Sequence, residues 1–180
     1  NRKILKENNV NFNLPSESFE LAKLLYNKKM FLEYCQNNNI NVGKIYFIKS
    51  YSEVKKILDK NTNKKFILKP AIGSGTKNVF FLNKKIKKKI KILESRNCFE
   101  INLQMLNKIY KFPKKHHCIL MPFYDGNMFD IDCISKNGKI KELVIRKRQF
   151  KNRFIFYSIG HRIVRNSKIK NLVSKFISKL

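Results

Sequence analysis

The segment Phe66–Val79 limits the possible folds most, because it predicts two strands joined by a loop that contains glycine. Its first three residues, Phe66-Ile67-Leu68, form the kind of short apolar run that makes a buried strand. A second β-rich run, Val79–Leu82, follows the loop. Because a strand follows, and because the loop contains no Gly-Lys-Ser/Thr, the segment fits neither a Rossmann fingerprint nor a Walker loop.

The loop itself has the composition of a phosphate-binding site. Gly73 and Gly75 flank Ser74, so the backbone can turn tightly and direct several N–H groups toward one point. Lys69, at the end of the first strand, can bring a full positive charge to the same point. This combination suits a polyphosphate. A plain β-hairpin with a Gly-Ser-Gly tip is the alternative, and the glycines alone would favour it.

The periodicities along the chain predict an α+β fold and not a series of βαβ units. Helices are expected between Ser16, as N-cap, and Cys35, after the capping box Ser50–Glu53, from Lys84 to Glu94, and over Ile169–Ile177. Further strands are expected at Ile45–Ile48, Cys118–Phe123, Phe129–Cys133, Ile140–Ile145 and Phe154–Ile159. Asn137-Gly138 predicts a two-residue hairpin turn, and the stretch 97–115 fits no single element.

The net charge of +28 arises from 40 Lys and Arg against 12 Asp and Glu. One explanation is a polyanionic partner: nucleic acid, an anionic membrane or a phosphorylated substrate. The other is compositional drift toward residues with A/T-rich codons, which we favour because the lysines are scattered along the chain. The absence of a helix-turn-helix, zinc-finger or ribonucleoprotein motif disfavours nucleic acid as a partner.

The four cysteines lie far apart and form no C-x-x-C pair, which favours the reducing cytoplasm over a disulfide framework. His116-His117-Cys118 lacks a second ligand pair at useful spacing, so we expect no metal site there. No apolar run approaches the roughly 18 residues that a membrane helix needs. The segment Asn1–Leu5 has neither an initiator Met nor a signal-peptide core, and we expect the natural chain to begin earlier.

Several segments, in the same order, resemble the ATP-grasp superfamily, most closely its carbamoyl-phosphate-synthase-like members. The loop described above matches the family pattern in which K-P-x-x-G-S-G joins two strands. The other matching segments are Asn27-Lys28, Asn39–Gly43, the hinge-like Ile119–Gly126, Phe129–Cys133 and Val144–Arg148. The resemblance covers nearly all of the chain. It implies an ATP-grasp fold in three parts: residues 1–15 as the end of a preceding Rossmann-like domain, 16–118 as the lid subdomain, and 119–180 as the start of the second subdomain.

The resemblance also implies which residues bind ATP. Lys28 and Lys69 would contact its phosphates, and the amides of Gly73–Gly75 would fold over them. The backbone from Met121 to Phe123 would hold adenine, with Ile67 as an apolar wall.

The implied activity is that of an ATP-dependent carboxylate–amine (or thiol) ligase. Mg²⁺ and the lysines would neutralise the γ-phosphate while a substrate carboxylate attacks it, and a nucleophile would then capture the acylphosphate. Arg146 and Arg148 would be catalytic, facing phosphate or the acyl substrate, unless they belong to a solvated strand face. The family's magnesium ligands follow a segment like Ile169–Leu180, so we expect them beyond residue 180 and expect the isolated chain to be inactive.

Two positions depart from the family pattern. The hinge glutamate that reads adenine corresponds to Pro122, and the ribose-binding glutamate falls on Met128. Asp130 or Asp132 could replace the latter, although their alternation with apolar residues fits an exposed strand face equally well. The alternative interpretation is therefore a degenerate, non-catalytic ATP-grasp remnant, or a basic module that binds polyanions or nucleic acid.

Overall fold

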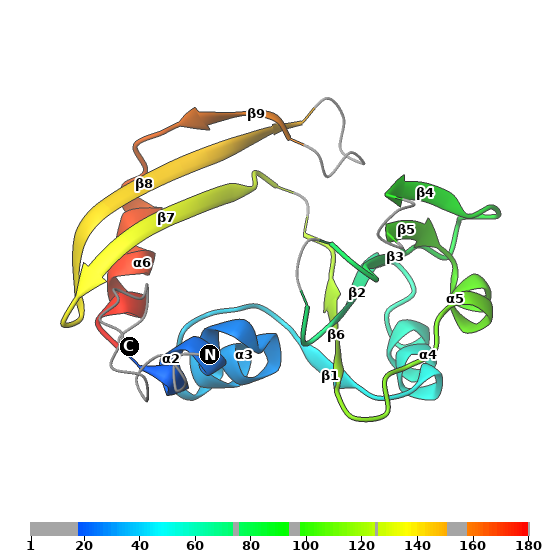
Figure 1. Cartoon of the computed structure of the whole chain (residues 1–180). Helices are drawn as coiled ribbons and strands as arrows, with labels where there is room; N and C mark the ends of the chain where they lie inside the picture. Colours follow the sequence, from blue (N-terminus) through cyan, green and yellow to red (C-terminus); the bar gives the residue numbers. More distant parts are fainter. Residues whose placement is uncertain (1–17, 74–75, 94–97, 125, 151–157, 180) are drawn as a thin grey trace, which may run out of the picture.

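The computed structural model describes residues 18–73, 76–93, 98–124, 126–150 and 158–179, which form two sheets and five helices (Figure 1). The larger sheet has the order β1-β6-β2-β3-β5-β4 and the smaller one the order β7-β8-β9. The strands are β1 Tyr46–Ile48, β2 Phe66–Pro70, β3 Phe80–Leu82, β4 Ile90–Leu93, β5 Cys98–Ile101, β6 Cys118–Pro122, β7 Phe129–Lys136, β8 Lys139–Phe150 and β9 Ser158–Ile163. The helices are α2 Phe19–Tyr26, α3 Lys28–Asn37, α4 Tyr51–Asp59, α5 Leu103–Ile109 and α6 Ser167–Ile177. None of these described helices is long and apolar enough to cross a membrane.

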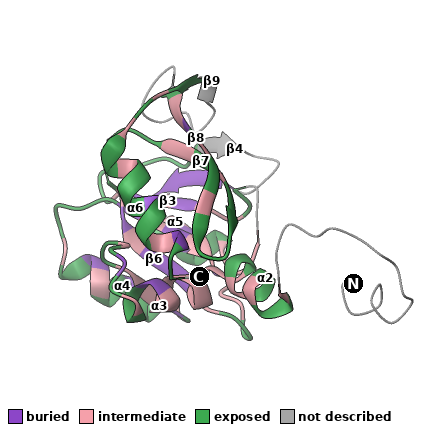
Figure 2. Ribbon diagram, turned by 90° about the vertical axis from the view of Figure 1, so that its left-hand side faces the viewer, coloured by how far each residue is buried: buried purple, intermediate pink, exposed green. Residues whose placement is uncertain are grey.

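The main hydrophobic core lies against one face of the six-stranded sheet, where α4 and α5 contribute side chains to it. Its members include Val54, Leu58, Phe66, Leu68, Phe80, Leu82, Leu106 and Leu120. Figure 2 shows the buried residues gathered in this part of the molecule, whereas most of α6 and most of the three-stranded sheet are exposed or intermediate. Because side chains alternate along a strand, Ile67 and Lys69 of β2 lie on the opposite face of the same sheet.

Local sequence signals account for the ends of the helices. The hydroxyl of Ser50 accepts the N–H of Glu53 at 3.3 Å, which confirms the predicted cap of α4. The cap prediction for α2 was wrong by two positions, because the helix begins after Ser18, whose hydroxyl accepts the N–H of Leu21 at 2.9 Å. The predicted N-cap, Ser16, lies outside the described residues.

The three-stranded sheet follows the predicted hairpin. Asn137 and Gly138 have φ values of 52° and 69°, as a two-residue turn between antiparallel strands requires, and they join β7 to β8. The predicted strand at 154–159 falls mostly outside the described residues, and β9 is described from residue 158. Helix α6 returns the chain to α3, where the rings of Phe31 and Phe176 meet edge to face with centroids 5.6 Å apart.

The predicted basic helix at 84–94 is wrong. Residues 90–93 form β4, which pairs antiparallel with β5, and the residues before it form turns and bends. A helix here would place lysines at i,i+4, as at Lys84 and Lys88, and such like-charge pairs are destabilising. The structure instead directs Lys84 to the end of α4, where its Nζ donates to the carbonyl of Leu58 at 3.0 Å. The stretch 97–115, which the sequence left unassigned, contains β5 and α5.

Candidate functional site

Two lysines that are far apart in the sequence meet at the loop after β2. Lys69 is near the end of β2, and Lys28 is the first residue of α3. The Lys28 ammonium donates to the carbonyl of Gly73, and the Lys28 N–H donates to the carbonyl of Ala71 at 3.0 Å. The start of α3 is thereby held against the loop. The predicted loop residues 74 and 75 lie outside the described residues.

A small cavity of about 190 Å³ lies at this junction. The residues that line it are Lys28, Lys69, Pro70, Gly73, Thr76, Lys77 and Val79. Among the described residues, the lining includes three lysines and no carboxylate. Gly73 has a φ of +125°, a conformation that a residue with a Cβ rarely adopts, so glycine is required here for its backbone conformation. The cavity therefore suits an anion that supplies the missing negative charge.

The lowered pKa values of the two lysines also favour an anion in this cavity. Burial, and then the positive charge of Lys28, lower the pKa of Lys69. Burial also lowers the pKa of Lys28. Removing a cation from water beside another cation is unfavourable, and an anion placed between them would relieve both effects. The pair is thus a candidate site for a negatively charged group.

The backbone amides at the start of α3 do not form a second anion site. The side-chain oxygen of Asn27 accepts the N–H groups of Lys29 and Met30 at 3.0 and 3.4 Å. The N–H of Lys28 is bonded to Ala71, and that of Phe31 donates to the carbonyl of Asn27 at 2.9 Å. All four amides therefore have partners, so the positive charge offered by α3 is the Lys28 side chain.

An apolar surface adjoins Lys69 on the same face of the sheet. Ile67 lies directly opposite Phe81 of β3 on one side and Met121 of β6 on the other. Cross-strand partners share a face, so these three side chains stand beside one another, two residues along β2 from Lys69. The ring of Phe123 meets that of Phe81 edge to face at 6.1 Å. The arrangement is a platform on which a flat ring could lie next to the lysine pair.

Phe81 belongs to this platform although the sequence analysis did not select it. The signal was present, because Phe81 stands between two core residues of β3 and so must face away from the core. Its neighbours, however, depend on the pairing of β2 with β3 in a particular register. In the predicted hinge, the backbone N–H of Phe123 already donates to the carbonyl of Lys65 at 2.8 Å, so it is not available to a ligand. The predicted roles of Ile67, Met121 and Phe123 toward adenine stay predictions.

The two predicted catalytic arginines lie in β8 and are paired with carboxylates of β7. Arg148 donates to both oxygens of Asp130, from Nε at 2.8 Å and from Nη2 at 2.6 Å. Arg146 Nη2 lies 2.8 Å from Asp132. His161 of β9 is 2.9 Å from the same Asp130 oxygen that Arg148 Nε contacts. The arginines therefore form a cross-strand ladder of charges, and their predicted catalytic role stays a prediction.

This ladder gives Asp130 a measurable role in acid stability. The hydrogen bonds from Arg148 hold the pKa of Asp130 below its ordinary value of 3.8. A carboxyl whose pKa is lowered by folding stabilises the protein above its unfolded pKa, and the effect is lost as the pH falls through the folded value. We expect Asp130→Asn to lower the free energy of unfolding by about 0.5–1 kcal/mol near neutral pH. In urea titrations the difference should shrink toward about pH 2, whereas a difference that persists at low pH would contradict the charge-based explanation.

The remaining predicted positions do not complete a metal site. Pro122 is buried in β6, and the carbonyl of Met128 accepts the N–H of Arg148 at 2.9 Å. Asp130 and Asp132, the suggested substitutes for a ribose-binding glutamate, contact the two arginines. Within the described part of the chain, no group of three or more His, Cys, Asp or Glu side chains could hold a metal ion. Among the described residues, the predicted positions thus bring a pair of lysines together without a cluster of metal ligands around it.

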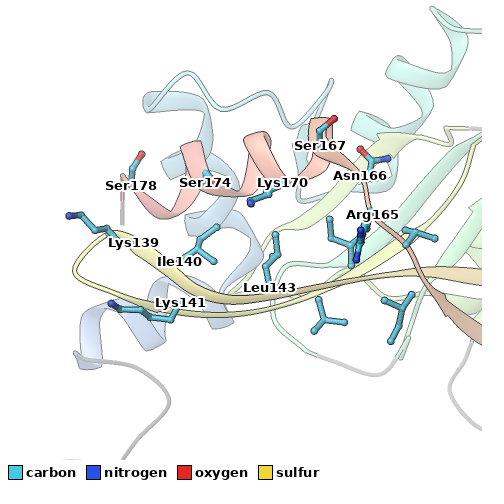
Figure 3. A pocket seen from close by; sticks show the side chains of 15 residues that line it. Lys139, Ile140, Lys141, Leu143, Arg165, Asn166, Ser167, Lys170, Ser174 and Ser178 are labelled. Carbon is cyan, nitrogen blue, oxygen red and sulfur yellow. The ribbon is translucent and has the colours of Figure 1, made fainter.

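A larger groove of about 1010 Å³ lies between β8 and α6 (Figure 3). Apolar side chains such as Leu143 and Ile145 line part of it, and Lys139, Lys141 and Lys170 add positive charge. Ser174 of α6, and Ser178 just after the helix, are among the lining residues with small side chains. None of the predicted site residues lines this groove, so it is separate from the lysine pair.

Comparison with known proteins supports the fold. No family model matches the sequence, and no curated protein sequence does so either. Among solved structures, the chain is similar to the L-amino acid ligase from Bacillus licheniformis, with a TM-score of 0.62 at 16% sequence identity. The similarity covers 98% of this chain and 38% of the ligase chain. It confirms the predicted α+β, ATP-grasp fold, with mainly antiparallel sheets, and at this identity it concerns the fold alone.

Proposed function

We propose that this chain is the ATP-binding part of an ATP-dependent carboxylate–amine (or thiol) ligase that acts through an acylphosphate. The observation that carries the proposal is that the lysine pair and the apolar platform share one face of the six-stranded sheet. A nucleotide has the same two parts, a polyanion and a flat ring joined at a short distance. The similarity to an L-amino acid ligase favours a ligase over other ATP-binding activities.

Each group has a defined task in this proposal. Lys28 and Lys69 neutralise the phosphates at the point where a substrate carboxylate attacks, which lowers the charge repulsion between two anions. Ile67 and Met121 bear against the adenine ring, with Phe81 extending the platform. The amides of the loop at 73–75 would fold over the phosphates, and closure of the lid over this loop would keep water from the reactive acylphosphate. Arg146 and Arg148 would have to break their hydrogen bonds to Asp132 and Asp130 before they could contact the substrate.

The subdomain division belongs to the same proposal. The six-stranded sheet carries the phosphate loop, and we assign most of it to a lid within 16–118. Strand β6, which spans the boundary between 16–118 and 119–180, pairs with β2 and so connects the lid to the remainder. The arginine ladder and α6 follow in the second part. Mg²⁺ is proposed as the companion of ATP, with ligands outside the described residues, and no step above depends on it.

One observation favours a second candidate, a nucleotide site that has lost part of its function. The N–H of Phe123 already donates to the carbonyl of Lys65, and Pro122 has no backbone N–H. An adenine-binding hinge built on these residues would have few donors available. In that case the lysine pair would still bind phosphate, but it would not distinguish ATP from other polyphosphates.

Calorimetric titration of Mg·ATP and of tripolyphosphate at about 150 mM salt separates the two candidates. We expect saturable binding of both ligands, with ATP the tighter. Lys28→Ala should weaken both by about 10- to 100-fold, because a hydrogen bond to a charged group contributes about 1.5–3 kcal/mol. Ile67→Ala should weaken ATP alone, because it removes part of the platform and leaves the cations in place.

The outcomes are distinct. Equal affinity for ATP and tripolyphosphate, unchanged by Ile67→Ala, would favour the degenerate site. Failure of both ligands to bind would reject the phosphate site itself. Lys64→Ala serves as the control, since this lysine is exposed and lies in the loop before β2, away from the cavity-lining residues.

A further inference from the structure

Two lysine-rich segments, 55–65 and 84–89, come together at one end of the molecule. Lys84 donates to the carbonyl of Leu58 at 3.0 Å and lies 3.6 Å from the carboxylate of Asp59, so the second segment lies against the end of α4. Figure 1 places α4 and β4 at the end of the molecule away from the β7–β9 sheet. We call the lysines of the two segments the lysine surface. They are Lys55, Lys56, Lys60, Lys64, Lys65, Lys84, Lys85, Lys87, Lys88 and Lys89, and all are exposed.

This density exceeds what the composition explains. The two segments hold ten lysines in seventeen residues. The chain as a whole has 40 Lys and Arg in 180 residues, which corresponds to about four in a stretch of that length. Compositional drift accounts for the average and not for the meeting of two dense segments in the fold. The sequence alone separates them by eighteen residues, which is why they appeared scattered.

Within the described part of the chain, the acidic groups near the lysine surface reduce its charge little. The carboxylate of Asp59 is occupied by Lys84. Glu100 is buried, accepts a hydrogen bond from Asn83 at 2.8 Å, and lies 4.0 Å from Lys65. Glu53 caps the other end of α4 by accepting the N–H of Lys49 at 2.7 Å. A concentrated positive field therefore remains at this end of the molecule, and such a field attracts polyanions.

We propose that the lysine surface binds the phosphate backbone of double-stranded nucleic acid. The two segments contain no aromatic residue, so they offer no ring on which the bases of a single strand could stack. They expose no large apolar side chain that would insert into a membrane, since Ile57, Leu58 and Ile86 are buried or half-buried. A duplex presents a dense, regular array of phosphates to which lysines bind without reading sequence. The surface excludes Lys28 and Lys69, so this proposal is independent of the nucleotide site.

Two five-lysine variants test the proposal. The first replaces Lys55, Lys56, Lys60, Lys87 and Lys88 with glutamine. The matched control replaces Lys136, Lys139, Lys141, Lys168 and Lys175, which are also exposed and lie on the β7–β8 hairpin and α6. Both changes remove the same charge. The first set leaves out Lys65, Lys84 and Lys89, whose side chains contact Glu100, Asp59 and the ring of Phe99.

Binding of a labelled 20-base-pair DNA duplex would be measured by fluorescence anisotropy over about 50–200 mM salt. We expect the first variant to bind at least about tenfold more weakly than the control at 150 mM salt. The slope of log affinity against log salt should be shallower by about four in this variant than in the control. Each of the five lysines would neutralise one phosphate, and roughly 0.9 counterions are released for each phosphate neutralised. Circular dichroism of both variants would verify that each is folded.

Equal losses in the two variants would overturn the proposal, because the affinity would then follow net charge alone. It would also be overturned if the unmodified chain bound the separated single strand as tightly as the duplex. A third contrary result would be binding to phosphatidylserine vesicles, with the variants ranked as expected, together with no binding to the duplex at 150 mM salt.

Discussion

Lys69→Met is expected to weaken ATP binding by about 10- to 100-fold and, at the same time, to raise the thermal unfolding midpoint of the free protein by about 1–3 °C. Methionine keeps most of the side-chain volume and removes a charge that burial and Lys28 both disfavour. A buried lysine that binds phosphate lowers the stability of the folded protein when no phosphate is bound. Opposite changes in affinity and stability would be the mark of a binding residue, in line with the general trade-off between activity and stability.

The pH dependence sharpens this prediction. Folding lowers the pKa of Lys69 below its ordinary value of 10.5, so the folded state binds fewer protons than the unfolded state between those two values. Stability of the unmodified protein should therefore rise with pH in that window, and Lys69→Met should show a smaller rise. Lys64→Met is the control and should change neither property, because Lys64 is exposed. A lower midpoint in Lys69→Met, with ATP affinity retained, would mean that Lys69 serves the fold.

Elements with strong local signals could be predicted from the sequence. The N-cap at Ser50 and the turn at Asn137-Gly138 each fix their geometry within a few residues, although Glu53 accepts the N–H of Lys49 and not that of Ser50 as a full capping box would. The stripe of α6 repeats over two full turns and places Val173 and Ile177 among its buried residues. In these cases the interaction that decides the structure is itself local, so a short stretch of sequence contains it.

Strand β4 could not be predicted from local signals. Ile86, Ile90 and Leu93 have helical spacing, but residues 90–93 pair with β5, which lay in the stretch that fitted no single element. The decisive interaction is a ladder between two segments that are each ambiguous alone. The same limit applies to the site. Lys69 was identifiable from its loop and Lys28 from the family resemblance, whereas Phe81 depends on the register between β2 and β3.

Leu120→Ala should destabilise the protein by about 2–5 kcal/mol, a large share of the 5–15 kcal/mol typical of a folded domain. Leu120 is fully buried in β6, the strand that pairs with β1 on one side and β2 on the other, and lies opposite Tyr46 and Leu68. Ile134→Ala, on a side chain that is 64% exposed, should change stability by less than about 0.5 kcal/mol. Urea unfolding with an unchanged m-value would measure both. Because Met121 faces the other side of the sheet, folded Leu120→Ala should still bind ATP. Similar losses in the two variants would mean that the core does not lie between this sheet and α4 and α5.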